Sequence, residues 1–70
     1  MKKIWYMLVV EDETVKMESL LNKFRVGLNE WDRTKTFLME DGSKVVGYTI
    51  MCTEEVFVSI NELMNGTRVF

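Results

Sequence analysis

The first apolar segment of the chain runs without interruption from Ile4 to Val10 and is rich in aromatic and β-branched residues. A run of this length and composition predicts a β-strand that is buried on both faces in the interior of a sheet. The pattern then changes to helical spacing, with an apolar stripe formed by Met17, Leu20, Leu21, Phe24 and Leu28. We therefore expect a helix from Glu13 to Asn29, with Asp12 as its N-cap.

Two segments rich in β-branched and aromatic residues follow, from Arg33 to Glu40 and from Lys44 to Cys52. Asp41-Gly42 between them favours a tight turn, because both residue types tolerate positive φ. The sequence therefore predicts an antiparallel hairpin.

Two registers of this hairpin are compatible with the sequence. A two-residue turn pairs Phe37 with Val46, whereas a three-residue turn with Gly42 in a bulge pairs Phe37 with Val45. The choice decides which face of the second strand meets the core.

A second helix is expected after Thr53, which is a suitable N-cap. Glu54 and Glu55 would complement the positive end of its dipole. Its apolar stripe consists of Val56, Phe57, Ile60, Leu63 and Met64. Asn65-Gly66 is a typical helix stop, and residues 67–70 are just long enough for a short fourth strand.

The order β-α-β-β-α, with a final short β-strand, predicts a ferredoxin-like or truncated ferredoxin-like α+β domain. In this arrangement two helices cover one face of an antiparallel sheet, and strands one and three are central. The 70 residues form one domain and leave no room for a second core.

The composition argues against an enzyme, a metal site or a disulfide. Cys52 is the only cysteine, and the chain has no histidine. A disulfide within the chain and the usual zinc ligand sets are therefore excluded. Ser and Cys side chains have no histidine base to activate them, and the glycines occur singly rather than in a phosphate-binding loop. We expect no catalytic residues and no cofactor.

The segment Met7–Glu13 resembles the opening of response-regulator receiver domains, in which an apolar first strand ends in acidic residues that bind Mg²⁺. That family also needs a phosphate-accepting Asp at the end of a later strand. The strand predicted here ends in Met51-Cys52-Thr53. We therefore interpret the acidic residues as the start of a helix.

The segment Val46–Met51 is similar to the second ribonucleoprotein motif of RNA-recognition-motif domains, which stack bases on sheet aromatics. The resemblance implies roles for Tyr48 and for Trp5 or Tyr6. Val46 and Ile50 depart from the motif, where the family prefers a basic and an aromatic residue. Single-stranded RNA binding is therefore the alternative function that we consider.

The uncovered face of the predicted sheet is the candidate binding surface. If Ile4, Tyr6, Leu8 and Val10 face the helices, then the opposite face carries Trp5, Met7 and Val9 beside Thr49 and Met51. A contiguous apolar patch of this kind marks an interface. Val15 and Val26, opposite the stripe of the first helix, form a second, smaller candidate patch.

The net charge of −2 favours neither nucleic acid nor an anionic membrane. The apolar start of the chain is followed at once by Glu11-Asp12-Glu13, which argues against a signal peptide and favours a cytoplasmic location without a membrane segment. The absence of Ala, Pro, His and Gln suggests a phage or mobile-element gene. We expect a non-enzymatic protein-binding module, acting as a homodimer, a regulator or an inhibitor of a larger protein through its open sheet face or an edge strand.

Overall fold

The computed structural model describes residues 1–64 and 68–69, with side chains for residues 1–64. Its elements are β1 (Lys3–Val10), the 3-10 turn η1 (Glu11–Glu13), α1 (Thr14–Lys23), β2 (Trp31–Leu38), β3 (Lys44–Cys52), α2 (Glu54–Leu63) and β4 (Arg68–Val69). The prediction of a small α+β fold with an antiparallel sheet and two helices is confirmed. The predicted helix stop at Asn65-Gly66 and the outer residues of the predicted fourth strand, 67 and 70, lie outside the described residues.

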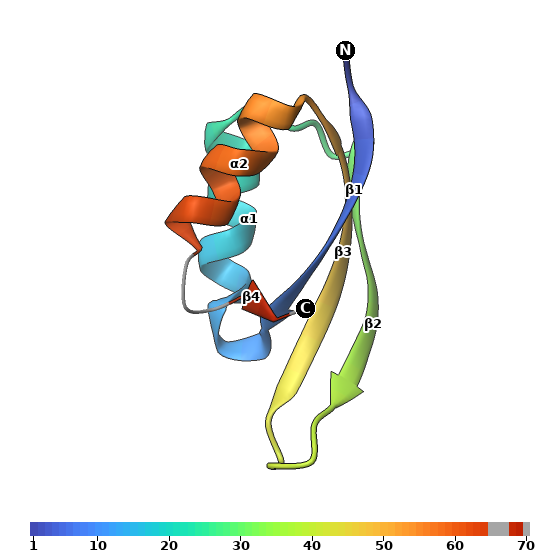
Figure 1. Ribbon diagram of the computed structural model, residues 1–70, viewed down its shortest axis with the longest axis vertical. Helices are drawn as coiled ribbons and strands as arrows, with labels where there is room; N and C mark the ends of the chain where they lie inside the picture. Colours follow the sequence, from blue (N-terminus) through green and yellow to red (C-terminus); the bar gives the residue numbers. More distant parts are fainter. Residues whose placement is uncertain (65–67, 70) are drawn as a thin grey trace.

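The described strands form an antiparallel sheet in the order β2-β3-β1-β4, so β1 and β3 lie in its interior. β1 pairs with β3 along its whole length, from Lys3 opposite Cys52 to Val10 opposite Val45. β4 pairs only with Leu8 and Val9 of β1. Both helices lie on the same side of the sheet, and the β2-β3 hairpin extends beyond them (Figure 1).

The start of α1 differs from the prediction, since Asp12 lies within η1 and does not cap the helix. The N-cap is Glu13, which makes no side-chain capping bond. Thr14, the first helical residue, donates its hydroxyl to the Glu11 carbonyl at 3.0 Å. The turn η1 therefore leads directly into α1, and the Thr14 hydrogen bond joins the two.

The predicted end of this helix at Asn29 is wrong, because α1 stops at Lys23. Arg25 has a positive φ of 59°, the left-handed conformation that commonly ends helices. The Val26 amide donates to the Leu21 carbonyl at 2.9 Å, which satisfies a carbonyl at the helix end. Local backbone hydrogen bonding thus closes the helix although apolar residues continue at helical spacing.

The early end of α1 changes the places of the apolar residues around it. Leu28, which we assigned to the core stripe, is exposed, and Val26, which we assigned to the surface, is buried. Val15 is exposed. The predicted surface patch of Val15 and Val26 is therefore wrong, because Val26 belongs to a turn and not to the helix face that carries Val15.

The hairpin adopts the second of the two predicted registers, in which Phe37 pairs with Val45. Gly42 has φ of 89°, and the Met39 amide donates to the Ser43 carbonyl at 2.8 Å, which closes a three-residue loop. The Asp41 side chain accepts from the Ser43 amide at 2.9 Å. A register shift between Arg33 and Thr36 of β2 interrupts the pairing with β3.

Thr53 caps α2 as predicted, since its hydroxyl accepts from the Val56 amide at 3.3 Å. The core lies between the helices and the sheet. Its fully buried side chains come from β1, α1, β3 and α2 and from the residue after α2: Met7, Val9, Met17, Leu21, Tyr48, Ile50, Ile60 and Met64. The side of the sheet that faces α1 and α2 is thus sealed.

Candidate functional site

The sheet has one face that no described helix covers, which we call the uncovered face. Opposed residues in neighbouring strands share a face, so the pairing defines its members. They are Ile4, Tyr6, Leu8 and Val10 of β1, Val45, Gly47, Thr49 and Met51 of β3, and Asp32, Thr34 and Phe37 of β2. The uncovered face is the candidate functional site.

Trp5, Met7 and Val9, which we predicted for this face, lie on the opposite one. Met7 and Val9 are fully buried in the core beneath the helices. The Trp5 ring stacks on Phe57 of α2, with centroids 4.4 Å apart and an interplanar angle of 8°. The orientation predicted for β1 is therefore wrong by one residue.

Thr49 and Met51 do lie on the uncovered face, because they pair with Tyr6 and Ile4. The structure thus separates the five predicted site residues. It brings Thr49 and Met51 together with Ile4, Tyr6 and Phe37, which sequence reasoning had not assigned to the site.

The orientation of β1 escaped prediction because apolar residues occupy both faces of the strand, so alternation does not show which face is buried. The indole of Trp5 finds a hydrogen-bond partner on the helix side, where Nε1 donates to the Cys52 carbonyl at 3.0 Å. On the other face, Tyr6 has room because Gly47 has no side chain. Gly47 was the available signal, since a glycine inside a strand often marks a close approach.

Tyr6 occupies the middle of the uncovered face. Its phenol lies over Gly47, and a Cβ built on residue 47 would overlap the Tyr6 hydroxyl and lie 2.6 Å from Thr34 Oγ1. The Tyr6 hydroxyl and Thr34 Oγ1 form a hydrogen bond of 3.3 Å. These contacts hold the ring along the sheet with about half of its surface exposed.

The exposed surface here is mainly apolar. The exposed fractions are 69% for Ile4, 48% for Tyr6, 41% for Met51 and 41% for Phe37. Val45, opposite Phe37, is buried. Of the residues named above as members of this face, Asp32 alone carries a charge. The uncovered face is therefore a nearly uncharged, partly aromatic surface.

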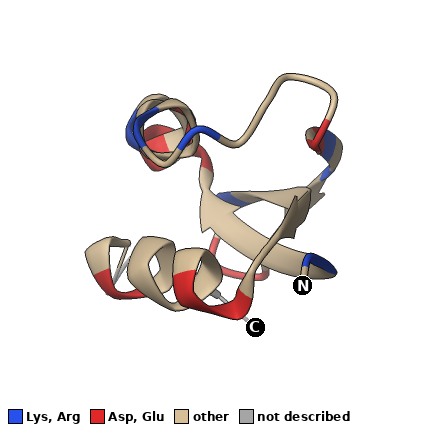
Figure 2. Ribbon diagram, turned by 90° about the horizontal axis from the view of Figure 1, so that it is seen from above, with Lys and Arg blue, Asp and Glu red and all other residues tan. Residues whose placement is uncertain are grey.

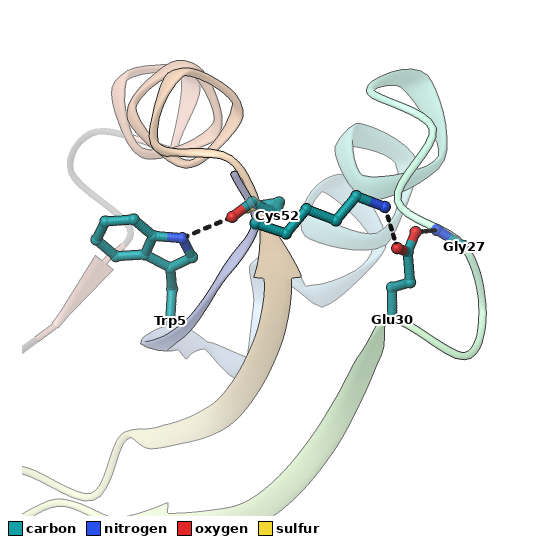
Figure 3. A network of polar contacts seen from close by, with 5 residues as sticks. Trp5, Gly27, Glu30 and Cys52 are labelled. Carbon is teal, nitrogen blue, oxygen red and sulfur yellow. Dashed lines mark hydrogen bonds and ion pairs between the residues drawn. The ribbon is translucent and has the colours of Figure 1, made fainter.

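An ion pair orders the end of the sheet where β1 begins. Lys2 forms a salt bridge with Glu30, and the other carboxylate oxygen of Glu30 accepts from the Gly27 amide at 3.0 Å (Figure 3). The Lys2 hydrogen bond, followed by the Gly27 amide, holds the pKa of Glu30 below its ordinary value. The Met51 amide donates to the Glu30 carbonyl at 2.7 Å, so this network fixes the loop before β2 against β3.

Tyr48 lies on the helix side of the sheet and is fully buried. Its hydroxyl donates to Glu18 of α1 at 2.8 Å, and Arg33 lies 3.4 Å from the same carboxylate. Burial, followed by the Glu18 hydrogen bond, raises the pKa of Tyr48. The ring therefore has a structural position and does not present a face to solvent, unlike the aromatic residues implied by the RNA-recognition resemblance.

The remaining reactive side chains are unremarkable. Cys52 is buried, and burial raises the pKa of its thiol, which disfavours the nucleophilic thiolate. Among residues 1–64 and 68–69, no group of three or more His, Cys, Asp or Glu side chains is arranged to hold a metal ion. No described helix is long and apolar enough to cross a membrane.

The edge formed by β2 is poorly suited to pairing with another strand. It carries Asp32, Arg33 and Lys35 within a short segment, and the register shift after Arg33 distorts its backbone. Charged residues and bulges are common protections of edge strands.

Comparison of the chain with protein-family models, curated proteins and solved structures gives no match.

Proposed function

We propose that this chain is a non-enzymatic protein-binding module of the ferredoxin-like class, which docks to a protein partner through the uncovered face. The observation that carries the proposal is the group of half-exposed apolar side chains on that face, Ile4, Tyr6, Met51 and Phe37. A small domain with both helices on one side of its sheet leaves the other side free for a partner. Regulation or inhibition of a larger protein is the role that fits such a module.

The chemistry of the face favours a protein over a nucleic acid. A nucleic-acid surface needs cations along the aromatic residues to neutralise phosphates. Lys2 and Arg33 are paired with Glu30 and Glu18. The other basic residues of β1, β2 and β3 are Lys3, Lys35 and Lys44, and none of them is among the members of the uncovered face. An uncharged surface with tyrosine and methionine instead resembles the centre of protein interfaces.

The test compares charge substitutions on and off the uncovered face. The partner is isolated from the native host with the wild-type chain, purified, and titrated against Ile4→Glu, Met51→Glu and the control Val15→Glu. Each substitution changes an exposed apolar residue, but Val15 lies on α1, away from the face. We expect the two face variants to bind about tenfold more weakly, which corresponds to about 1.4 kcal/mol, and the control to bind like wild type.

Equal weakening by Val15→Glu, or no weakening by either face variant, would refute the proposal. Light scattering of the purified chain decides whether the partner is a second copy. A labelled single-stranded oligonucleotide that binds the wild type and loses affinity with Tyr6→Ala would replace the protein partner by a nucleic acid.

A further inference from the structure

The outer edge of β1 is paired over only part of its length. β4 lies beside Leu8 and Val9, Met7 is buried, and no described strand pairs with this edge over residues 3–6. The other edge of β1 is fully occupied by β3. Residues along an unpaired strand edge present free backbone N–H and C=O groups to an incoming strand. Over residues 3–6 this edge of β1 therefore has no described strand beside it.

A groove between the start of β1 and α2 adjoins this edge. Its lining includes Lys3 of β1 and Glu54, Glu55, Val58 and Glu62 of α2. α2 carries acidic residues and no Lys or Arg (Figure 2). None of the three glutamates forms an ion pair with a residue that the structure describes. The groove is thus negatively charged and its carboxylates are available to a cationic ligand.

We propose that the open edge of β1 binds an extended segment of a partner protein, which adds a strand in line with β4 and directs basic residues toward α2. The inference rests on the proposed function and deepens it by naming the class of partner. Backbone hydrogen bonds to an edge give affinity in such strand addition, and the side chains give specificity.

The position of the added strand dictates its sequence pattern. Side chains of a strand alternate between the two faces, so one set lies near the carboxylates of α2 and the other beside Ile4 and Tyr6 on the uncovered face. A segment in which Lys or Arg alternates with apolar residues satisfies both environments. The two surfaces of the chain then contact one continuous partner.

A second copy of the chain is a poorer occupant. Edge-to-edge pairing of β1 with its copy would place two acidic α2 helices side by side on the same face of the joined sheet. Like charges brought together across an interface oppose association. The charge of α2 thus selects a basic partner.

A fluorescence titration tests the inference with a defined probe. Trp5 lies on β1 at the open edge, and Trp31→Phe leaves Trp5 as the tryptophan that reports on binding. The probe is a synthetic peptide of alternating Lys and Val. We expect a saturable change in Trp5 emission at low ionic strength, with an affinity that falls as salt is added.

Matched charge reversals locate the site. Glu55→Lys combined with Glu62→Lys should weaken peptide binding about tenfold, whereas Glu40→Lys, an exposed reversal in the hairpin, should leave it unchanged. Glu62→Lys alone places a cation near the helix C-terminus, where it does not disturb folding, and should show part of the loss. Circular dichroism confirms that each variant is folded.

Two further peptides make the result decisive. Methylation of alternate backbone nitrogens in the Lys-Val peptide removes strand hydrogen bonds and should abolish binding, and a Glu-Val peptide should not bind. The inference is overturned if the Lys-Val peptide fails to bind, or if methylation or exchange of Lys for Glu has no effect.

The two proposals fail in different ways. If the Lys-Val peptide does not bind but Met51→Glu still weakens partner binding, the edge site is refuted and the uncovered face stays the proposed docking surface. If Met51→Glu and Ile4→Glu bind the partner like wild type while the peptide still binds, the uncovered face is refuted as the docking surface.

Discussion

Tyr6 lies over Gly47 on the uncovered face, and its hydroxyl occupies the space that a side chain on residue 47 would need. The two residues belong to neighbouring central strands and are diagonal to each other, since Tyr6 pairs with Thr49 and Gly47 with Leu8. The orientation of β1 and the shape of the candidate site therefore depend on a residue without a Cβ.

Gly47→Ala should destabilise the domain by about 1 kcal/mol, because the new methyl group displaces the Tyr6 ring from the sheet. In a Tyr6→Ala background the same substitution should cost clearly less, because the contact with the Tyr6 hydroxyl is gone and the close approach of 2.6 Å to Thr34 Oγ1 remains. Urea unfolding of the four proteins in this double-mutant cycle measures the coupling. Additive effects would show that the two side-chain positions are independent.

Trp5 should contribute far more to stability than Ile4, its neighbour on β1. Trp5→Ala removes the stack on Phe57 and the hydrogen bond to the Cys52 carbonyl, and should cost about 3 kcal/mol. Ile4→Ala changes a largely exposed side chain and should cost about 0.5 kcal/mol or less. Chemical denaturation of both variants tests the assignment of faces, and a reversed order of the two costs would contradict it.

The Lys2–Glu30 ion pair should make stability depend on pH. Folding lowers the pKa of Glu30. The stabilisation by the charged carboxylate is therefore fully present above the ordinary pKa of Glu in the unfolded chain, and it is lost as pH falls through the lower pKa of the folded state. Unfolding midpoints should therefore fall between about pH 5 and about pH 3 by more in the wild type than in Glu30→Gln. Identical pH profiles for the two proteins would contradict a role of this pair.

Cys52 should react slowly with a thiol reagent in the native protein. Its side chain is buried, and burial raises the pKa of the thiol, so both access and thiolate formation are disfavoured. The reaction with a disulfide reagent should be faster by about a hundredfold or more in urea, because the unfolded chain exposes the thiol without local opening of the fold. Equal rates in buffer and in urea would show that the strand end at Cys52 is open.

Much of the fold was predictable from local patterns. The apolar run of β1, the hairpin at Asp41-Gly42 and the N-cap Thr53 each act through neighbouring residues, so their physical preferences are visible in the chain. The end of α1 was not, because the left-handed turn at Arg25 overrides a continuing apolar pattern and is not marked by glycine at that position.

Local sequence determined the elements and their approximate limits, because turn, capping and strand preferences act over a few residues. The partial burial of Trp5 and the exposure of Tyr6 were decided by the assembled sheet. Both faces of β1 are apolar, and the choice between them depends on Gly47, Phe57 and the Cys52 carbonyl. Contacts between residues distant in the chain thus decided which apolar face of β1 became part of the core and which stayed exposed.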